Sequence, residues 1–329
     1  IPAGILLIGP EHYSEFLLDL IFYILFTSGT AGILNKILFS GTHRMMAQEA
    51  VRRIDSLLAE PSVVESTLAR IPDRNDVEFQ DVTFTYPGGK TPALTHLSFQ
   101  IPEGKTVALV GASGSGKTTA AALIPRFWDA QEGAVYIGGV PVPQIPKYEL
   151  MNRIAFVFQD SRLLKASILE NVRASRPDAT REQVMEALRA AQCDDILEKL
   201  PKGMDTVLGS KGVYLSGGEQ QRIALARAIL KDAPIVLLDE ATAFADPENE
   251  HKIQIAFERL TKGKTVLMIA HRLPTIQNAD EILVLEQGSI AERGTHDALM
   301  ERNGIYASMW RDYQTSVAWN IGKETHHAS

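Results

Sequence analysis

The sequence predicts an α/β fold built on a parallel sheet with a phosphate-binding loop, preceded by a helix long enough to cross a membrane. Residues 111–118 fit the pattern G-x-x-x-x-G-K-[ST] and lie between a short apolar run and a helical segment. Residues 235–238 form a continuous apolar run, which is typical of a parallel strand buried on both faces, and two carboxylates follow it. Residues 16–39 are mostly apolar. These three stretches define the expected organisation of the chain.

Length and composition restrict the class of protein. The 329 residues are enough for one large or two smaller domains. The formal net charge of −7 gives no electrostatic case for nucleic-acid binding, so we expect no nucleic-acid partner. The single cysteine, Cys193, excludes an internal disulfide and suits a reducing compartment. Because the sequence opens on Ile1 within an apolar stretch, we interpret it as the C-terminal part of a longer protein.

The apolar segment near the N-terminus predicts a membrane helix. As a helix, residues 16–39 would extend about 36 Å, enough to cross a bilayer with some tilt. Four polar side chains recur at helical spacing on one stripe: Asp19, Tyr23, Thr27 and Thr30. Lipid would penalise such a stripe, so we expect it to face other helices or a wet cavity. The alternative is a buried amphipathic helix in a soluble domain.

The charges that flank this segment predict its orientation. Acidic residues lie on its N-terminal side at positions 11, 15 and 19, whereas basic residues lie toward its C-terminal side at positions 36, 44, 52 and 53. Basic residues mark the cytosolic end of a membrane helix. We therefore expect residues 1–60 to be the end of a multi-pass domain in the cell (inner or plasma) membrane, with the rest of the chain in the cytoplasm. Pro61 should break the helix, and residues 61–76 are expected to form a linker.

The glycine-rich loop has the composition that phosphate binding needs. Glycines let the main chain wrap round an anion with its N–H groups pointing inward, and the N-terminus of the next helix adds positive charge. Lys117 can reach the β- and γ-phosphates of a nucleotide, and the Thr118 hydroxyl can ligate Mg²⁺. A chance match is the alternative, but the flanking strand and helix favour a nucleoside triphosphate site. The expected phosphate-binding residues are Gly111, Ala112, Ser113, Gly114, Ser115, Gly116, Lys117, Thr118 and Thr119.

Two adjacent carboxylates follow the second apolar run. Asp239 and Glu240 stand at its C-terminal end, where open α/β sheets bind ligands. Asp239 can hold Mg²⁺ directly or through water, and Glu240 can polarise a water for attack on the γ-phosphate. A solvated strand end is the alternative. Tyr86 could stack on a base, although ordinary packing is the simpler reading. Gln159 and His271 would each be unremarkable residues after a strand if they stood alone.

A second glycine pair precedes a long helical segment. Residues 215–220 read LSGGEQ, in which Ser216 and Glu219 match a capping box. The pair Gly217 and Gly218 is less ordinary, because glycines at the start of a helix cost stability yet expose N–H groups to an anion. We therefore expect a second phosphate-facing surface in this chain.

Taken together, these motifs resemble those of ATP-binding cassette (ABC) proteins. The order of phosphate loop, Gln159, LSGGEQ, the strand before Asp239 and Glu240, and His271 is similar to the whole cassette over about residues 77–312. The resemblance implies an α/β P-loop NTPase fold with a RecA-like core, a helical subdomain and an antiparallel β subdomain. The preceding helix resembles the last membrane span of exporter-fold half-transporters. Residues 313–329 are expected to form a loosely held tail.

The resemblance also implies the roles of individual residues. ATP would lie on the phosphate loop, and Tyr86 would stack on its adenine. The ligands of Mg²⁺ would be Thr118, Gln159 and Asp239. Glu240 would be the general base, and His271 would contact the γ-phosphate. Each ATP would be enclosed by a second half-transporter subunit, identical or different, in a head-to-tail pair. The residues that would act across this pair are Ser216, Gly217, Gly218 and Asp246.

One segment departs from the family pattern. Residues 241–246 read Ala-Thr-Ala-Phe-Ala-Asp, where the family more often ends in Ser-Ala-Leu-Asp. The variant is similar to that of half-transporters associated with siderophore or iron handling, which leaves an importer as an alternative to an exporter. A soluble ABC ATPase and a non-hydrolysing regulatory cassette are two further alternatives. The transported substrate is unknown from sequence.

Overall fold

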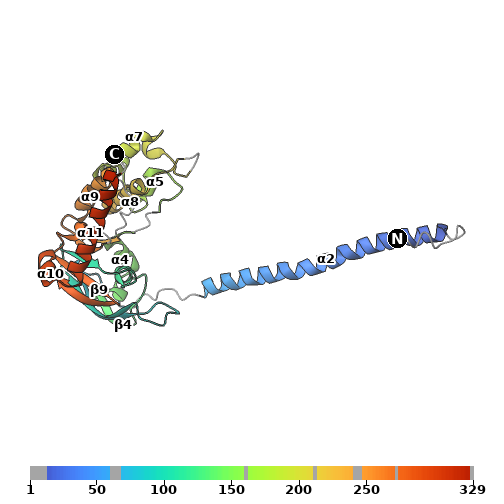
Figure 1. The fold of residues 1–329 in the computed structure, drawn as a ribbon, viewed down its shortest axis with the longest axis horizontal. Helices are drawn as coiled ribbons and strands as arrows, with labels where there is room; N and C mark the ends of the chain where they lie inside the picture. Colours follow the sequence, from blue (N-terminus) through green and yellow to red (C-terminus); the bar gives the residue numbers. More distant parts are fainter. Residues whose placement is uncertain are drawn as a thin grey trace. The chain divides into compact units, whose positions relative to one another are not determined.

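A computed structural model describes residues 13–59, 68–158, 162–209, 213–239, 247–270 and 273–326. The chain divides into two units, Ile1–Val64 and Glu65–Ser329, and each is described by itself (Figure 1).

The described part of the first unit forms one long helix, α2 (Tyr13–Leu58). Its 46 residues correspond to about 69 Å at about 1.5 Å per residue, roughly twice the hydrocarbon thickness of a bilayer. Large apolar side chains along it are exposed, Leu18 and Phe22 each to 69%. It is the one helix of the described residues that is long and apolar enough to cross a membrane. An exposed surface of this kind needs lipid or other apolar helices to cover it.

The second unit contains two sheets, as an α/β cassette requires. The six-stranded sheet has the order β10-β9-β3-β8-β7-β6, and β6, β7, β8, β3 and β9 pair in parallel, which confirms the predicted parallel sheet. The four-stranded sheet, β2-β1-β4-β5, is antiparallel. The strand bounds are β1 Val77–Phe84, β2 Leu94–Ile101, β3 Thr106–Val110, β4 Glu132–Ile137, β5 Val140–Pro141, β6 Ile154–Val157, β7 Ile235–Asp239, β8 Thr265–Ile269, β9 Glu281–Glu286 and β10 Ser289–Gly294.

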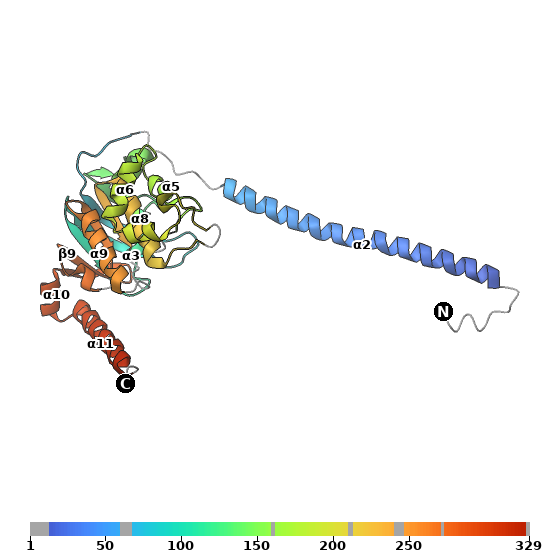
Figure 2. The ribbon, with the colours of Figure 1, turned by 90° about the horizontal axis from the view of Figure 1, so that it is seen from above.

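Helices cover the parallel sheet and form a separate helical subdomain, seen in Figure 2 where α5, α6 and α8 lie together. One apolar core joins this subdomain to β6 and β7, and a second lies between the two sheets and α3. The helix bounds are α3 Lys117–Leu123, α4 Lys147–Arg153, α5 Ile168–Arg173, α6 Arg181–Ala190, α7 Asp194–Lys199, α8 Gly217–Lys231, α9 Pro247–Thr261, α10 His296–Arg302 and α11 Ile305–His326. Short 3₁₀ turns occur at Val142–Gln144, Gly203–Asp205 and Leu273–Ile276.

The C-terminal helix α11 begins inside the cassette. The Glu292 carboxylate accepts hydrogen bonds from the first backbone N–H groups of the helix, Ile305 N at 2.7 Å and Tyr306 N at 3.0 Å. A carboxylate at a helix N-terminus also complements the helix dipole. Tyr306 and Trp310 are buried in a third apolar core. The boundary that the sequence predicts between residues 312 and 313 falls inside this continuous helix.

The lone cysteine should be inert in the folded protein. Cys193 is fully buried, and burial raises the pKa of its thiol to about 12, against the opposing charge of Arg222. Since the thiolate is the reactive form, native protein at neutral pH should resist a maleimide, whereas urea-unfolded protein should react at once. A cysteine introduced at the exposed Lys90 is the control and should label in the native state. Rapid native labelling at Cys193 would contradict this burial.

Candidate nucleotide-binding site

The loop between β3 and α3 is shaped by three glycines with positive φ: Gly111 at +148°, Gly114 at +79° and Gly116 at +103°. A Cβ on Gly111 would lie 2.2 Å from the backbone oxygen of Leu285, and one on Gly116 would lie 2.7 Å from that of Ala93. Glycine is required at these two positions because any side chain would clash with the neighbouring backbone. At Gly114 no atom lies within 4 Å of a Cβ position, so the loop is open there and a phosphate can approach the main chain.

Lys117 is the first residue of α3, and its side chain turns back over the loop. Its Nζ donates to the carbonyl oxygens of Gly111 and Ala112, each at 2.8 Å, and to Ser115 Oγ at 3.4 Å. Burial lowers the pKa of the ammonium group, and the charge of Asp239 opposes that effect. The loop carbonyls thus hold a buried cation at the phosphate loop, where it can bind phosphate oxygens.

Thr118 and Asp239 meet although they are far apart in the sequence. Thr118 Oγ1 donates to Asp239 Oδ2 at 3.3 Å, and Asp239 is buried at the end of β7. Strands β3 and β7 flank β8 in parallel, so the C-terminal end of β7 lies near the start of α3. A hydroxyl and a carboxylate are hard oxygen donors, so this pair fits Mg²⁺. The predicted metal ligands Thr118 and Asp239 are therefore brought together.

Four predicted site residues lie outside the described residues: Gln159, Glu240, Asp246 and His271. The strands that lead to three of them are described. Strand β6 ends two residues before Gln159, β7 ends directly before Glu240, and β8 ends two residues before His271. These three strands are parallel neighbours in register, so their C-terminal ends lie at one edge of the sheet.

Tyr86 is fixed to the helix that follows the loop. Its hydroxyl lies 3.0 Å from Thr119 Oγ1, and its ring makes edge contacts with Phe84 and Trp128. The residue is 39% exposed, so part of it is accessible to a base. Sequence reasoning missed Trp128, which buttresses Tyr86 at 5.5 Å between ring centroids. Trp128 follows the phosphate-loop helix by only a few residues, and this position in the sequence could have indicated its role.

The segment LSGGEQ begins α8 with the predicted capping box. Ser216 Oγ accepts from Glu219 N at 3.3 Å, and Glu219 Oε2 accepts from Ser216 N at 2.8 Å. Gly218 is buried, whereas a Cβ on Gly217 would meet no atom within 4 Å. Among the described residues no hydrogen bond or ion pair joins residues 216–218 to the phosphate loop. The capping box uses the N–H groups of Ser216 and Glu219, and the exposed Gly217 leaves the start of the helix open.

A buried ion network anchors α8. Arg222 is fully buried and donates to both carboxylate oxygens of Asp195, at 2.7 and 3.1 Å, while Lys252 of α9 donates to Asp195 at 3.1 Å. Burial alone would raise the pKa of Asp195, but the hydrogen bonds from Arg222 and Lys252 outweigh it and lower the pKa to about 2. Asp195 thus holds the helices that begin at residues 217 and 247.

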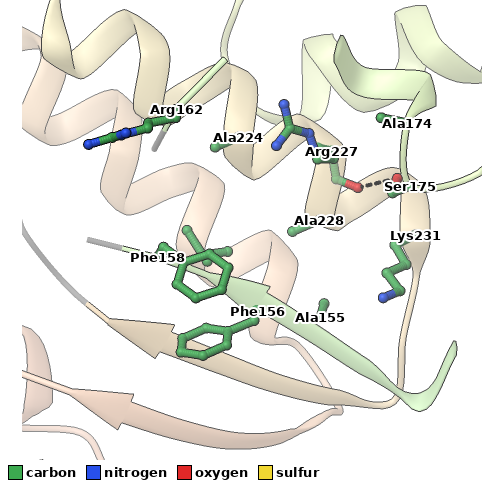
Figure 3. Close-up of a pocket in the computed structure, with 11 residues that line it drawn as sticks. Ala155, Phe156, Phe158, Arg162, Ala174, Ser175, Ala224, Arg227, Ala228 and Lys231 are labelled. Atoms are coloured by element: carbon green, nitrogen blue, oxygen red, sulfur yellow. Dashed lines mark hydrogen bonds between the residues drawn. The ribbon is translucent and has the colours of Figure 1, made fainter. Parts of the chain in front are cut away.

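A separate groove of about 460 Å³ lies between β6, the residues that follow α5, and α8 (Figure 3). The rings of Phe156 and Phe158 stack at 4.1 Å on one side of it, and Arg227 of α8 lies on the other. Burial lowers the pKa of both Arg227 and Lys231. None of the predicted ATP-site residues that the structure describes lines this groove.

The chain was compared with known proteins. Residues 94–243 match the family model described as ABC transporter. Over 235 residues, 71% of this chain, it is 50% identical to the ATP-dependent lipid A-core flippase of Escherichia coli K12 and covers 40% of that protein. The chain belongs to the ABC transporter family.

Other relatives agree with this assignment. Over 79% of its length the ABC chain is 44% identical to the ATP-dependent lipid A-core flippase of Chromobacterium violaceum, of which it covers 45%. A solved structure described as a bacterial Atm1-family ABC exporter with ATP bound matches with a TM-score of 0.73 and 37% identity, over 82% of this chain and 47% of that one. The chain spans less than half the length of these relatives. The predicted exporter-fold half-transporter with its P-loop cassette is confirmed.

The loop glycines should respond differently to alanine. Gly111→Ala forces a Cβ against backbone, so overpacking of about 1–3 kcal/mol should add to the positive-φ strain and lower the melting temperature. Gly114→Ala should cost only the strain, about 1–2 kcal/mol, but its methyl group would occupy the open position above the loop. Thermal melting and ATP titration of both variants check this. Normal ATP affinity in Gly114→Ala would be the contrary result.

The buried ion network should make the cassette sensitive to acid. Because the pKa of Asp195 falls from 3.8 to about 2 on folding, its contribution is complete above about pH 4 and is lost as the pH falls toward 2. Asp195→Asn leaves Arg222 buried without its anion, which should cost roughly 3–5 kcal/mol at pH 7. Urea unfolding from pH 7 to 2.5 measures both effects. The free energy of unfolding of Asp195→Asn should fall less between pH 4 and 2.5 than that of the wild type. An equal fall in both proteins would contradict the role given to Asp195.

Proposed function

We propose that this chain is the ATP-binding and ATP-hydrolysing part of an ABC half-transporter that exports a substrate across a membrane. The proposal rests on one observation: Lys117, Thr118 and Asp239 come together at the open phosphate loop. The same chain also contains α2, a helix long enough to cross a membrane. A buried ammonium group and two oxygen donors around open backbone are what a nucleotide triphosphate with Mg²⁺ requires.

In the proposed site each residue has a chemical task. Tyr86 stacks on the adenine, the loop N–H groups from Gly111 to Thr119 bind phosphate oxygens, and the N-terminus of α3 adds its dipole. Lys117 neutralises charge on the β- and γ-phosphates. Mg²⁺, attended by Thr118, Asp239 and Gln159, supplies charge neutralisation at the phosphate oxygens when it is bound.

Hydrolysis is assigned to the residues after the strand ends. Glu240 takes a proton from a water whose oxygen forms the new bond to the γ-phosphorus, while the bond to the bridging oxygen of ADP breaks. His271 contacts the γ-phosphate and helps to hold the attacking water. The common edge of β6, β7 and β8 supports this grouping, because Gln159, Glu240 and His271 follow these strands closely.

The proposed assembly is a pair of half-transporters, identical or different, in a membrane. Ser216, Gly217 and Gly218 of one subunit would close the ATP site of the other, together with Asp246. Support comes from the cap of α8, where a Cβ on Gly217 would meet no described atom within 4 Å outside its chain neighbours and its own helix backbone. ATP binding would close the pair and hydrolysis would reopen it, moving membrane helices between two states. The full protein would be multi-pass, with its cassette in the cytoplasm.

The names of the relatives bear on the alternatives. They are called flippases or an exporter, so neither the importer nor the soluble ABC ATPase is favoured. The family model match at residues 94–243 lies within the cassette, which handles ATP rather than the transported molecule. The likeness therefore supports export in general and does not assign a lipid substrate to this chain.

Replacing Glu240 tests the proposal. Glu240→Gln keeps the size of the side chain but removes the basic carboxylate, so ATP hydrolysis by the full-length protein should fall by roughly 10²–10⁴-fold. ATP binding should persist, and the closed pair should accumulate in cross-linking or distance measurements. Lys117→Ala is the matched variant and should weaken ATP binding itself. Hydrolysis at the wild-type rate in Glu240→Gln would remove Glu240 from the role of base.

A further inference from the structure

Residues 59–76, here called the connector, lead from α2 to β1. Hydrogen bonds attach the second half of the connector to the cassette. Backbone hydrogen bonds join Arg70 N to Gln144 O and Gly138 N to Asp76 O, each at 2.9 Å. Pro72 and Asp76 are buried. At Gly138, with φ of +55°, a Cβ would lie 2.6 Å from the Arg74 backbone oxygen and would push the segment away. Residues 70–76 therefore belong to the cassette surface.

One side chain completes this attachment. Arg153 Nη2 donates to the Pro72 backbone oxygen at 2.6 Å, and Arg153 Nη1 donates to Asn75 Oδ1 at 2.9 Å. Asn75 Nδ2 in turn donates to Glu103 Oε1 at 2.8 Å. The guanidinium is partly buried, so these charge-assisted bonds are shielded from water. Its fork spans two acceptors three residues apart, which the single ammonium of a lysine would not match.

Arg153 also lies on a short path to the ATP site. It is the last residue of α4, and β6 begins at the next residue, Ile154. Strand β6 is four residues long, about 13 Å, and its C-terminal end leads to Gln159. It pairs in register with β7, which ends at Asp239. Strand β6 therefore has Arg153, which holds the connector, just before its N-terminal end. Its C-terminal end leads to the proposed nucleotide-binding residue Gln159.

We propose that Arg153 is a positioning residue that couples the ATP site to the membrane helix by clamping residues 70–76 to the cassette. The inference rests on the proposed function, ATP-driven transport. With the clamp in place, a displacement of β6 that follows ATP binding is passed to the connector and so to α2. Without it, the cassette still binds and hydrolyses ATP, but the connector no longer follows. Among the described residues, no hydrogen bond joins Arg153 to a proposed nucleotide-binding residue, so we assign its effect to coupling.

The test uses the full-length protein in lipid vesicles with three substitutions. Arg153→Met removes the fork, Arg153→Lys keeps the charge without the fork, and Asn75→Ala removes one acceptor without altering α4. Lys147→Met is the matched control, because Lys147 is an exposed cation at the start of the same helix. Spin labels on Leu18→Cys in both subunits report the ATP-driven distance change at the exposed end of α2. ATPase rate and hydrogen exchange are measured in parallel.

In Arg153→Met the amides of Arg70 and Gly138 should exchange roughly tenfold faster or more, as expected for loss of hydrogen bonds from a charged donor. ATP hydrolysis should stay close to the wild-type rate, while the ATP-driven distance change is lost. Arg153→Lys and Asn75→Ala should be intermediate, and Lys147→Met should behave as wild type.

Two results would overturn the inference: an unchanged distance response in Arg153→Met, or a parallel loss of ATP hydrolysis, which would make Arg153 merely structural for the cassette. Failure of the wild-type protein to hydrolyse ATP would instead refute the proposed function. These outcomes therefore distinguish the two proposals.

Discussion

The parallel register of β6, β7, β8 and β3 is the constraint on which the rest of the cassette depends. Parallel strands present their C-terminal ends at one edge of a sheet, so every residue that follows such an end is brought to the same place. Asp239 meets Thr118 for this reason, although more than a hundred residues separate them in the chain. The glycines of the loop then decide how close that edge lies to a ligand, since Gly111 and Gly116 let it pack against backbone while Gly114 leaves it open.

Buried charged side chains fix the position of α8, whose N-terminus carries the LSGGEQ segment. Arg222 has no access to solvent, and a buried guanidinium without an anion would be costly. Asp195 satisfies it and binds Lys252 as well, so α7, α8 and α9 converge on one carboxylate. The arrangement determines the position of Ser216 and Gly217, which cap α8 one to two turns away. In the proposed pair this cap would meet the nucleotide of the other subunit, and a fixed position of α8 would favour that contact.

The connector, residues 59–76, is the segment through which we propose that the cassette acts on α2. Arg153 donates to Pro72 and Asn75, Arg70 N donates to Gln144 O, and Gly138 N donates to Asp76 O. These hydrogen bonds make the end of the connector part of the cassette. Arg153 leads directly into β6, so a single short strand links the clamp with the region of Gln159. Strands transmit displacement well because their paired backbone is stiff, whereas a chain attached at one point would absorb it.

The sequence by itself determined the motifs and their local structure. The glycine pattern of residues 111–118, the apolar run before Asp239 and the capping box of Ser216 and Glu219 depend on neighbours close in the chain, so spacing reveals them. It also determined the membrane-length helix, because hydropathy is additive along a segment. Only the tertiary structure decided which distant side chains meet: Tyr86 with Thr119 and Trp128, Arg222 with Asp195, and Arg153 with Pro72. Such pairs follow from strand order and helix packing, which no local pattern encodes.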